Sequence, residues 1–225
     1  MEKKQIKDII SATTRPIVLY GPVGTGKTSV ANEVVKELGG GYSITLHRDM
    51  LAQELLGHFI PKGNDFIFLQ GLVTRAWMEG KPLVVNEVDK ASDSCFDVLH
   101  ALFDDPMIAE LTLPTGEVIR PKEGYKVIAT MNGDPRDLPD EAVKDRLSIR
   151  ILMDMPPDNR TLQLPKEIFE VLKNSYKNIS DVKITTREAI AYADLMTKID
   201  KEVAANIVFR EKGNDVIKAI QLAKE

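Results

Sequence analysis

The pattern of hydrophobic and polar residues divides the chain into two parts. Up to about residue 157, short apolar runs typical of buried strands alternate with amphipathic segments typical of helices. After Pro156-Pro157 the apolar runs stop, and only helical periodicity remains. Strands that alternate with helices, followed by helices alone, predict an α/β domain over residues 1–157 and a small helical domain over residues 158–225.

The predicted elements follow this division. Leu83-Val-Val85 is an unbroken apolar run, as a central parallel strand that is buried on both faces requires. Segments 57–69 and 111–119 indicate hairpins, because turn residues separate their apolar residues. We expect strands at 17–20, 42–46, 83–85, 125–131 and 147–153, and helices at 3–11, 29–38, 50–56, 70–79, 92–104, 140–145, 165–176, 186–199, 203–210 and 215–224.

A glycine-rich segment between the first strand and its helix carries the strongest chemical signal. Residues Gly21–Thr28 fit the pattern G-x-x-x-x-G-K-[ST] at every fixed position. Its glycines let the backbone wrap around a phosphate, and its amide groups then face the anion. We expect Lys27 to reach the β- and γ-phosphates and Thr28 to bind Mg²⁺. The predicted nucleotide-binding residues are Gly21, Pro22, Val23, Gly24, Thr25, Gly26, Lys27, Thr28 and Ser29.

The ends of two apolar strands supply candidate catalytic residues. A strand of this kind commonly ends in an acidic pair, but here the pair is Asn86-Glu87. Glu87 is a candidate general base at the edge where open α/β sheets bind ligands. Asn86 is a candidate metal residue that acts through a bound water, since it lacks the carboxylate's attraction for Mg²⁺. Asn132 follows another buried strand, where it would either hold the attacking water or form a turn.

Two arginines lie at the ends of predicted helices. Arg146 follows the short helix at 140–145, and Arg187 lies in the first turn of a helix in the C-terminal part. From their positions alone, a solvated surface role and a functional role fit equally well.

Composition narrows the classes of function. The chain has 225 residues, 43% of them hydrophobic, and a net charge of −4, which argues against a dedicated nucleic-acid binder. Cys95 is the only cysteine, so no intrachain disulfide forms and a cytoplasmic location is expected. No apolar run is long enough to span a bilayer, so we expect no membrane insertion. The histidines lack ligand spacing, so no zinc site is expected.

Taken in order, these motifs resemble an AAA+ ATPase of the MoxR and dynein-related branch. The resemblance rests on Gly21–Thr28, Glu87, Ala129-Thr-Met-Asn132, Asp145-Arg146 and Thr186-Arg187, together with the two hairpins. It implies a P-loop sheet of order 5-1-4-3-2 with a helical lid, and ATP and Mg²⁺ as cofactors. It also implies a ring-shaped homo-oligomer, usually a hexamer. Such proteins typically remodel a client protein, often with a von Willebrand factor A-domain partner.

The resemblance also implies roles for single residues. Glu87 would activate water, and Asn132 would be the sensor 1 residue. Arg146 would be an arginine finger that acts on ATP held by the neighbouring subunit, so that activity depends on assembly. Arg187 would be the sensor 2 residue. Asn86 departs from the family's usual aspartate, which puts Mg²⁺ binding and the hydrolysis rate in doubt, and Leu147 stands where phenylalanine often follows the finger.

Alternative functions stay open on the sequence. A nucleotide-dependent assembly switch with little or no hydrolysis is favoured by Asn86. GTP in place of ATP is suggested by Asn86-x-x-Asp89, which faintly resembles the guanine-reading N-K-x-D, although no aspartate is followed three residues later by glycine. A DNA-remodelling motor is disfavoured by the acidic balance. The hairpin aromatics Phe59, Phe66 and Phe68 either face a pore or client or pack on their own domain.

Overall fold

The computed structural model describes residues 3–224, which divide into two compact units. The first unit contains the chain up to Gly21 and the segment Lys27–Met153. The second contains Pro22–Gly26 together with the chain from Asp154 onward. The domain boundary that the sequence suggests near residue 158 stays a proposal.

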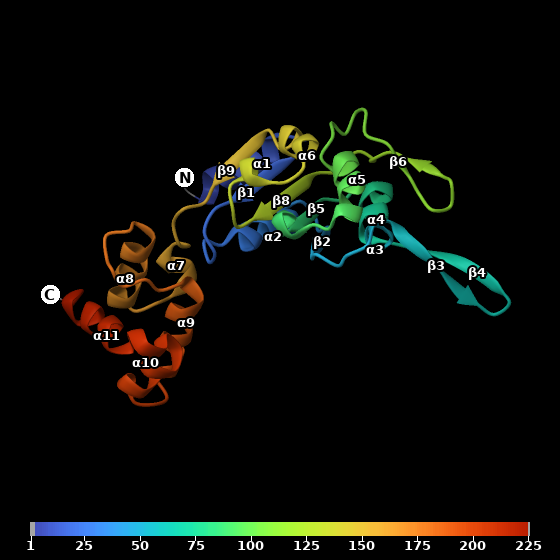
Figure 1. Cartoon of the computed structure of the whole chain (residues 1–225). Helices are drawn as coiled ribbons and strands as arrows, with labels where there is room; N and C mark the ends of the chain where they lie inside the picture. Colours follow the sequence, from blue (N-terminus) through green and yellow to red (C-terminus); the bar gives the residue numbers. More distant parts are fainter. Residues whose placement is uncertain (1–2, 225) are drawn as a thin grey trace. The chain divides into compact units, whose positions relative to one another are not determined.

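A parallel sheet organises the first unit (Figure 1). Its strands lie in the order β2-β5-β8-β1-β9, and every neighbouring pair is parallel. Numbered along the sheet's own strands, this is the predicted order 5-1-4-3-2, so the predicted fold class is confirmed. The strands are β1 (Ile17–Tyr20), β2 (Tyr42–Thr45), β5 (Leu83–Asn86), β8 (Val127–Met131) and β9 (Ile149–Leu152).

Apolar residues on both faces of each central strand explain why the sheet is buried. Successive side chains of a strand point to opposite faces. On β1, Ile17 and Leu19 pack with helices α1 (Lys3–Ala12) and α2 (Lys27–Glu37), while Val18 packs in a separate core on the other face. On β5, Val84 lies in the same core as Ile17 and Leu19, and Val85 lies in the same core as Val18. This two-faced burial produces the unbroken apolar runs seen in the sequence.

Helices and two hairpins surround the sheet. The helices are α1 (Lys3–Ala12), α2 (Lys27–Glu37), α3 (Ala52–Leu56), α4 (Leu72–Glu79), α5 (Asp93–Leu102) and α6 (Glu141–Arg146), with 3-10 turns η1 (Val88–Lys90) and η2 (Pro135–Asp137). The hairpins pair β3 (Gly57–Lys62) with β4 (Asp65–Gln70), and β6 (Leu111–Thr112) with β7 (Val118–Ile119). Figure 1 shows β3 and β4 extending away from the sheet.

The second unit is helical, as its periodicity predicts. Its elements are α7 (Asn159–Leu162), α8 (Lys166–Tyr176), α9 (Thr186–Leu195), α10 (Lys201–Phe209), η3 (Arg210–Lys212) and α11 (Gly213–Leu222). Ile168, Leu172, Tyr192 and Phe209 lie in its separate core. The Thr185 hydroxyl and the Glu188 carboxylate cap the start of α9, where the sequence carries T-x-x-E.

The predicted elements agree with the observed ones apart from their ends and the shortest turns. The second helix begins at Lys27, two residues before the predicted start, because the end of the glycine loop already has helical geometry. The 3-10 turns and α7 were not predicted, since segments of three or four residues show no period. No helix within residues 3–224 has the length and apolarity needed to cross a membrane.

Candidate nucleotide-binding site

The register of the sheet places three candidate segments of the first unit side by side at the carboxyl ends of neighbouring strands. Tyr20, the last residue of β1, is paired with Met131, the last residue of β8. Val85 is paired with Ala129, which puts Asn86 beside Thr130 at the end of β5. Gly21, Glu87 and Asn132 each follow one of these strand ends directly. The carboxyl edge of a parallel sheet is where α/β proteins bind ligands.

Asn86 is at the centre of a polar cluster, which we call the Asn86 cluster: Thr28, Ser43, Asn86 and Thr130. Asn86 and Thr130 are buried, whereas Thr28 and Ser43 are exposed. The Asn86 side chain is only 4% exposed. Its Oδ1 accepts hydrogen bonds from the hydroxyls of Thr28 and Thr130, each at 3.0 Å. Its Nδ2 donates to Ser43 Oγ at 3.0 Å and to the Ile44 carbonyl at 3.2 Å. The amide therefore uses its whole capacity for hydrogen bonds within the chain.

This cluster orients the Thr28 hydroxyl. Because Thr28 donates its one proton to Asn86, the lone pairs of its oxygen point elsewhere and suit a cation. Residues 3–224 contain no group of three or more His, Cys, Asp or Glu side chains that would hold a metal by themselves. Mg²⁺ rarely needs one, since it commonly binds through one or two protein oxygens, waters and substrate phosphates. The Thr28 hydroxyl therefore fits a direct bond to Mg²⁺, whereas Asn86 would act on the metal only by orienting Thr28.

Lys27 is the buried cation of the site. Its side chain is 7% exposed, and its Nζ donates to the Gly21 carbonyl at 2.8 Å across the base of the glycine loop. Burial lowers the pKa of Lys27, and the negative charge of Asp89 opposes that decrease. An anionic phosphate would also favour the charged ammonium.

Glu87 and Asp89 follow β5 in an unusual backbone conformation. Glu87 has φ of 57° and ψ of 48°, the left-handed region that residues other than glycine rarely adopt. Its side chain is exposed at the carboxyl end of β5. Such strain costs about 1–3 kcal/mol and tends to occur at functional sites. In Asp89, Oδ1 is buried and has no hydrogen-bond partner within residues 3–224, while Oδ2 lies 3.3 Å from Lys90 Nζ.

The remaining predicted residues lie at several places. Asn132 and Ser29 are exposed in the first unit, Asn132 directly after β8 and Ser29 in the first turn of α2. Within the second unit, Pro22–Gly26 form the tip of the glycine loop, and Thr25 Oγ1 donates to the Pro22 carbonyl at 3.0 Å. Arg187 is exposed near the start of α9 in that unit.

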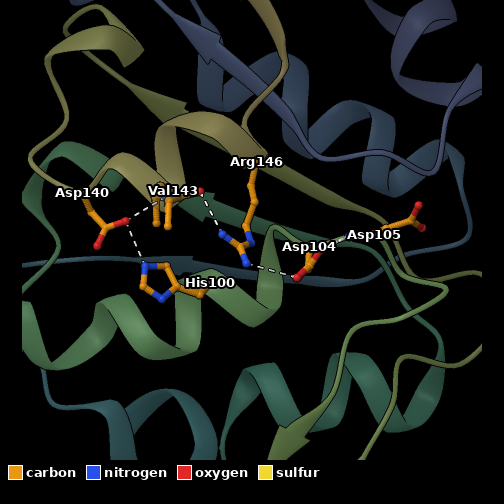
Figure 2. A network of polar contacts seen from close by, with 7 residues as sticks. His100, Asp104, Asp105, Asp140, Val143 and Arg146 are labelled. Carbon is orange, nitrogen blue, oxygen red and sulfur yellow. Dashed lines mark hydrogen bonds and ion pairs between the residues drawn. The ribbon is translucent and has the colours of Figure 1, made fainter.

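Arg146 lies in a second polar group of the first unit, which we call the α5–α6 corner: His100, Asp104, Asp140 and Arg146 (Figure 2). Arg146 Nη2 lies 3.3 Å from Asp104 Oδ2, and Nη1 donates to the Ala142 carbonyl at 3.2 Å. Arg146 Nε is buried and has no hydrogen-bond partner in the described part of the chain. The corner is thus only partly satisfied by its own residues.

Asp140 and His100 support the helix that carries Arg146. Asp140 Oδ1 accepts from the Val143 amide at 2.8 Å, which caps α6, and lies 2.9 Å from His100 Nε2 (Figure 2). The Val143 amide and His100 lower the pKa of Asp140, because both stabilise the carboxylate.

Several supporting residues were not predicted as part of the site. Thr130, Ser43 and Asp104 show no signal of their own in the sequence, because they act through contacts between segments far apart in the chain. Asp89 does carry a signal, since it lies three residues after Asn86, but that spacing suggests a role only in guanine recognition.

Comparison with known proteins identifies the family. The model of the AAA domain, dynein-related subfamily, matches residues 16–147, which include the glycine loop, both strand ends and Arg146. The chain belongs to this family. The predicted AAA+ ATPase of the MoxR and dynein-related branch is thereby confirmed.

Relatives of this AAA domain protein include NorQ of Paracoccus denitrificans, which is 34% identical over 123 residues, 54% of this chain and 45% of NorQ. The match thus spans less than half of NorQ. An uncharacterized protein of Staphylococcus aureus strain RF122 is 29% identical over 224 residues, 88% of this chain and 84% of its own length.

Two solved structures share the fold of this AAA domain protein. NtrX from Brucella abortus, solved in complex with ADP, has a TM-score of 0.53 and 14% identity and covers 98% of this chain and 47% of its own. A candidate ATPase from Cytophaga hutchinsonii has a TM-score of 0.53 and 19% identity and covers 89% of this chain and 60% of its own. At these identities the likeness concerns the fold alone.

Proposed function

We propose that this AAA domain protein binds ATP and Mg²⁺ at Gly21–Thr28, hydrolyses the ATP in a homo-oligomeric ring, and uses the cycle to remodel a client protein in the cytoplasm. One observation carries the proposal: the carboxyl ends of neighbouring parallel strands bring together Lys27, Thr28, Asn86 and Glu87. A hexamer and a von Willebrand factor A-domain partner are part of the proposal through the family resemblance.

Binding would begin at the glycine loop. The loop amides would donate to the phosphates, and the Lys27 ammonium would exchange the Gly21 carbonyl for phosphate oxygens. Thr28 and, through it, Asn86 would hold Mg²⁺, which when bound would neutralise phosphate charge. Ser29 follows as an exposed residue of the same helix start.

Hydrolysis would use residues on both sides of the nucleotide. Glu87 would take a proton from water as the water oxygen bonds to the γ-phosphorus, and the bond from that phosphorus to the bridging oxygen would break, leaving its electron pair on ADP. Asn132 would orient the water. Arg146 from a neighbouring subunit and Arg187 would stabilise the charge on the γ-phosphate. Arg146 Nε has no hydrogen-bond partner within residues 3–224, which supports a role outside its own chain.

The hairpin β3–β4 is the candidate client surface. Phe66 is 71% exposed and Phe59 is 49% exposed. Phe68, by contrast, packs on the main core of the first unit and lies edge-on to Phe59 at 5.5 Å. Exposed aromatic side chains are typical of surfaces that bind other proteins.

The decisive experiment is the substitution Glu87→Gln, which keeps the shape of the side chain but removes its basicity. General-base catalysis typically contributes about 10²–10⁴ in rate, so ATP turnover should fall by that factor while nucleotide binding is kept. Glu141→Gln is the matched control, because that side chain is 85% exposed and forms an ion pair with Lys144.

A nucleotide-dependent assembly switch is the second candidate function, and the saturated amide of Asn86 favours it. A neutral residue with every hydrogen bond used inside the chain attracts Mg²⁺ weakly. If wild-type protein binds ATP but Glu87→Gln leaves its turnover unchanged, the switch replaces the ATPase as the function.

A further inference from the structure

Two hydroxyl groups of the second unit bind the tip of the glycine loop, which belongs to the same unit. Tyr176, the last residue of α8, donates from its hydroxyl to the Val23 carbonyl at 2.7 Å. Thr186, the first residue of α9, donates to the Gly24 carbonyl at 2.6 Å and is only 5% exposed. Neither residue belongs to the predicted nucleotide site.

The two hydroxyls act on adjacent peptide groups and are fully used there. Tyr176 Oη and Thr186 Oγ1 lie 3.1 Å apart. Each hydroxyl has a single proton to donate, so once both protons go to the carbonyls none remains for a bond between the two oxygens. Their closeness follows from the closeness of the two carbonyls that they bind.

Planarity of the peptide bond converts these contacts into control over the loop's amide groups. In a trans peptide the C=O and the following N–H point in opposite directions. The bond from Tyr176 to the Val23 carbonyl therefore fixes the direction of the Gly24 N–H. The bond from Thr186 to the Gly24 carbonyl fixes that of the Thr25 N–H in the same way. In loops of this pattern, such amides are the donors that hold phosphate.

The close fit at Gly24 is a separate observation on the same contact. Gly24 has φ of 85°, and a Cβ placed there would lie 2.7 Å from Tyr176 Oη and 3.1 Å from Thr186 Oγ1. Any side chain would therefore push the hydroxyls off the carbonyls, besides straining the backbone. The glycine at this non-fixed position of the motif is explained by its contact with the helices of the second unit.

We propose that Tyr176 and Thr186 are positioning residues that hold the Val23–Thr25 peptides in the orientation that binds a nucleotide's phosphates. This inference rests on the proposed function, because it needs the loop to bind nucleotide. The two residues would act through the loop backbone of their own unit rather than through a side chain that touches the nucleotide.

The test measures the affinity of the full chain for ADP by titration calorimetry. Tyr176→Phe and Thr186→Val each remove one hydroxyl with little change in shape. A typical net hydrogen bond corresponds to about 3- to 10-fold in an equilibrium constant, so each variant should bind ADP weaker by about that factor. Thr186→Ser keeps the hydroxyl and should bind ADP like the wild type, which a role of the residue in packing alone would not predict.

Two control variants remove hydroxyls of the same unit that do not bind the loop. Tyr192 is buried beside Phe209, and the Thr197 hydroxyl donates to the Asp194 carbonyl at 2.7 Å. Tyr192→Phe and Thr197→Val should leave ADP affinity unchanged. Thermal melts of the nucleotide-free variants separate a loss of folding from a loss of binding.

Each outcome decides a separate question. Wild-type affinity in both Tyr176→Phe and Thr186→Val overturns the inference while the proposed function stands. Equal loss in Thr186→Ser and Thr186→Val also overturns it, because the hydroxyl is then irrelevant. No ADP binding by wild type instead overturns the proposed function. If Thr186→Val fails to fold, Tyr176→Phe alone decides.

Discussion

The Asn86 cluster and the α5–α6 corner are two polar groups of the same unit, but they differ in completeness. In the first, a 4% exposed amide makes all four of its hydrogen bonds at 3.0–3.2 Å within the chain. In the second, Arg146 reaches Asp104 only at 3.3 Å, and its Nε is buried without a hydrogen-bond partner in the described part of the chain.

The two groups thus differ in whether the chain itself supplies a partner for every buried polar atom of the central side chain. Leaving a buried donor unpaired costs about 1–3 kcal/mol, so native chains rarely do so without reason. The Asn86 cluster follows that rule and fixes the position of Thr28. The α5–α6 corner breaks it at the residue that family resemblance makes an arginine finger. This difference supports the proposal that Arg146 acts on a partner molecule.

The largest expected effect comes from removing Arg146. Arginine fingers contribute about 10³–10⁵ in rate, so Arg146→Ala should lower ATP turnover by at least about 10³-fold while each chain still binds ATP. Turnover measured across a dilution series should also fall for the wild type as the proposed oligomer dissociates. Arg160→Ala is the control, since that side chain is 94% exposed.

Mixing two inactive variants tests whether Arg146 acts across subunits. Lys27→Ala lacks the lysine that is proposed to bind phosphate but keeps Arg146, and Arg146→Ala has the reverse defect. A mixture should regain activity, because some interfaces then combine an intact loop with an intact arginine. A mixture as inactive as its components would show that Arg146 serves its own chain, and the contrast between the two regions would lose its meaning.

A smaller effect is expected from Asn86→Asp, which restores the residue usual in the family. The carboxylate cannot donate to the Ile44 carbonyl, now 3.2 Å from Nδ2, so that carbonyl loses its side-chain donor and lies beside a buried charge. We expect a loss of about 1–3 kcal/mol in the free energy of unfolding without Mg²⁺, together with tighter Mg²⁺ binding. The fluorescence of Trp77, the only tryptophan, reports urea unfolding of the first unit, where it is fully buried.

The matched control for that substitution is Asn32→Asp, which makes the same change of charge on the exposed face of α2. It should move the unfolding midpoint little. If Asn86→Asp proves as stable as wild type, the two hydrogen bonds that Asn86 Nδ2 donates do not contribute to the free energy of unfolding. The Asn86 cluster would then be weaker than its distances suggest.

The fold could be predicted from the sequence because the signals that determine it are local. Ile17–Tyr20 and residues 83–85 are unbroken apolar runs, since both faces of the sheet are covered. The turn residues at the two hairpins likewise act within a few positions. The parallel order came from the family resemblance, since apolar runs do not determine which strands are neighbours.

The candidate site could be predicted only in part, for the same physical reason. Glu87 and Lys27 were predicted as site residues because motif spacing is a local signal. The residues around Glu87 do not predict its left-handed backbone. The hydrogen-bond partners of Asn86 come from β2, α2 and β8, which are far from it in the sequence. The hydroxyls of Tyr176 and Thr186 lie more than 150 positions from the loop carbonyls that they bind, 153 for Tyr176 and Val23 and 162 for Thr186 and Gly24.

The smallest expected effect concerns Asp104, which holds Arg146 within its own chain. Ion pairs that are about one third exposed, as here, contribute about 0.2–1 kcal/mol. Asp104→Asn should therefore cost little stability, and at protein concentrations where assembly is incomplete it should raise ATP turnover by up to about 5-fold, because Arg146 no longer has to leave its partner. Asp97→Asn, on the exposed face of α5, is the control and should change neither quantity. A fall in turnover like that of Arg146→Ala would instead make Asp104 the group that aims the arginine, and the corner would then be complete as it stands.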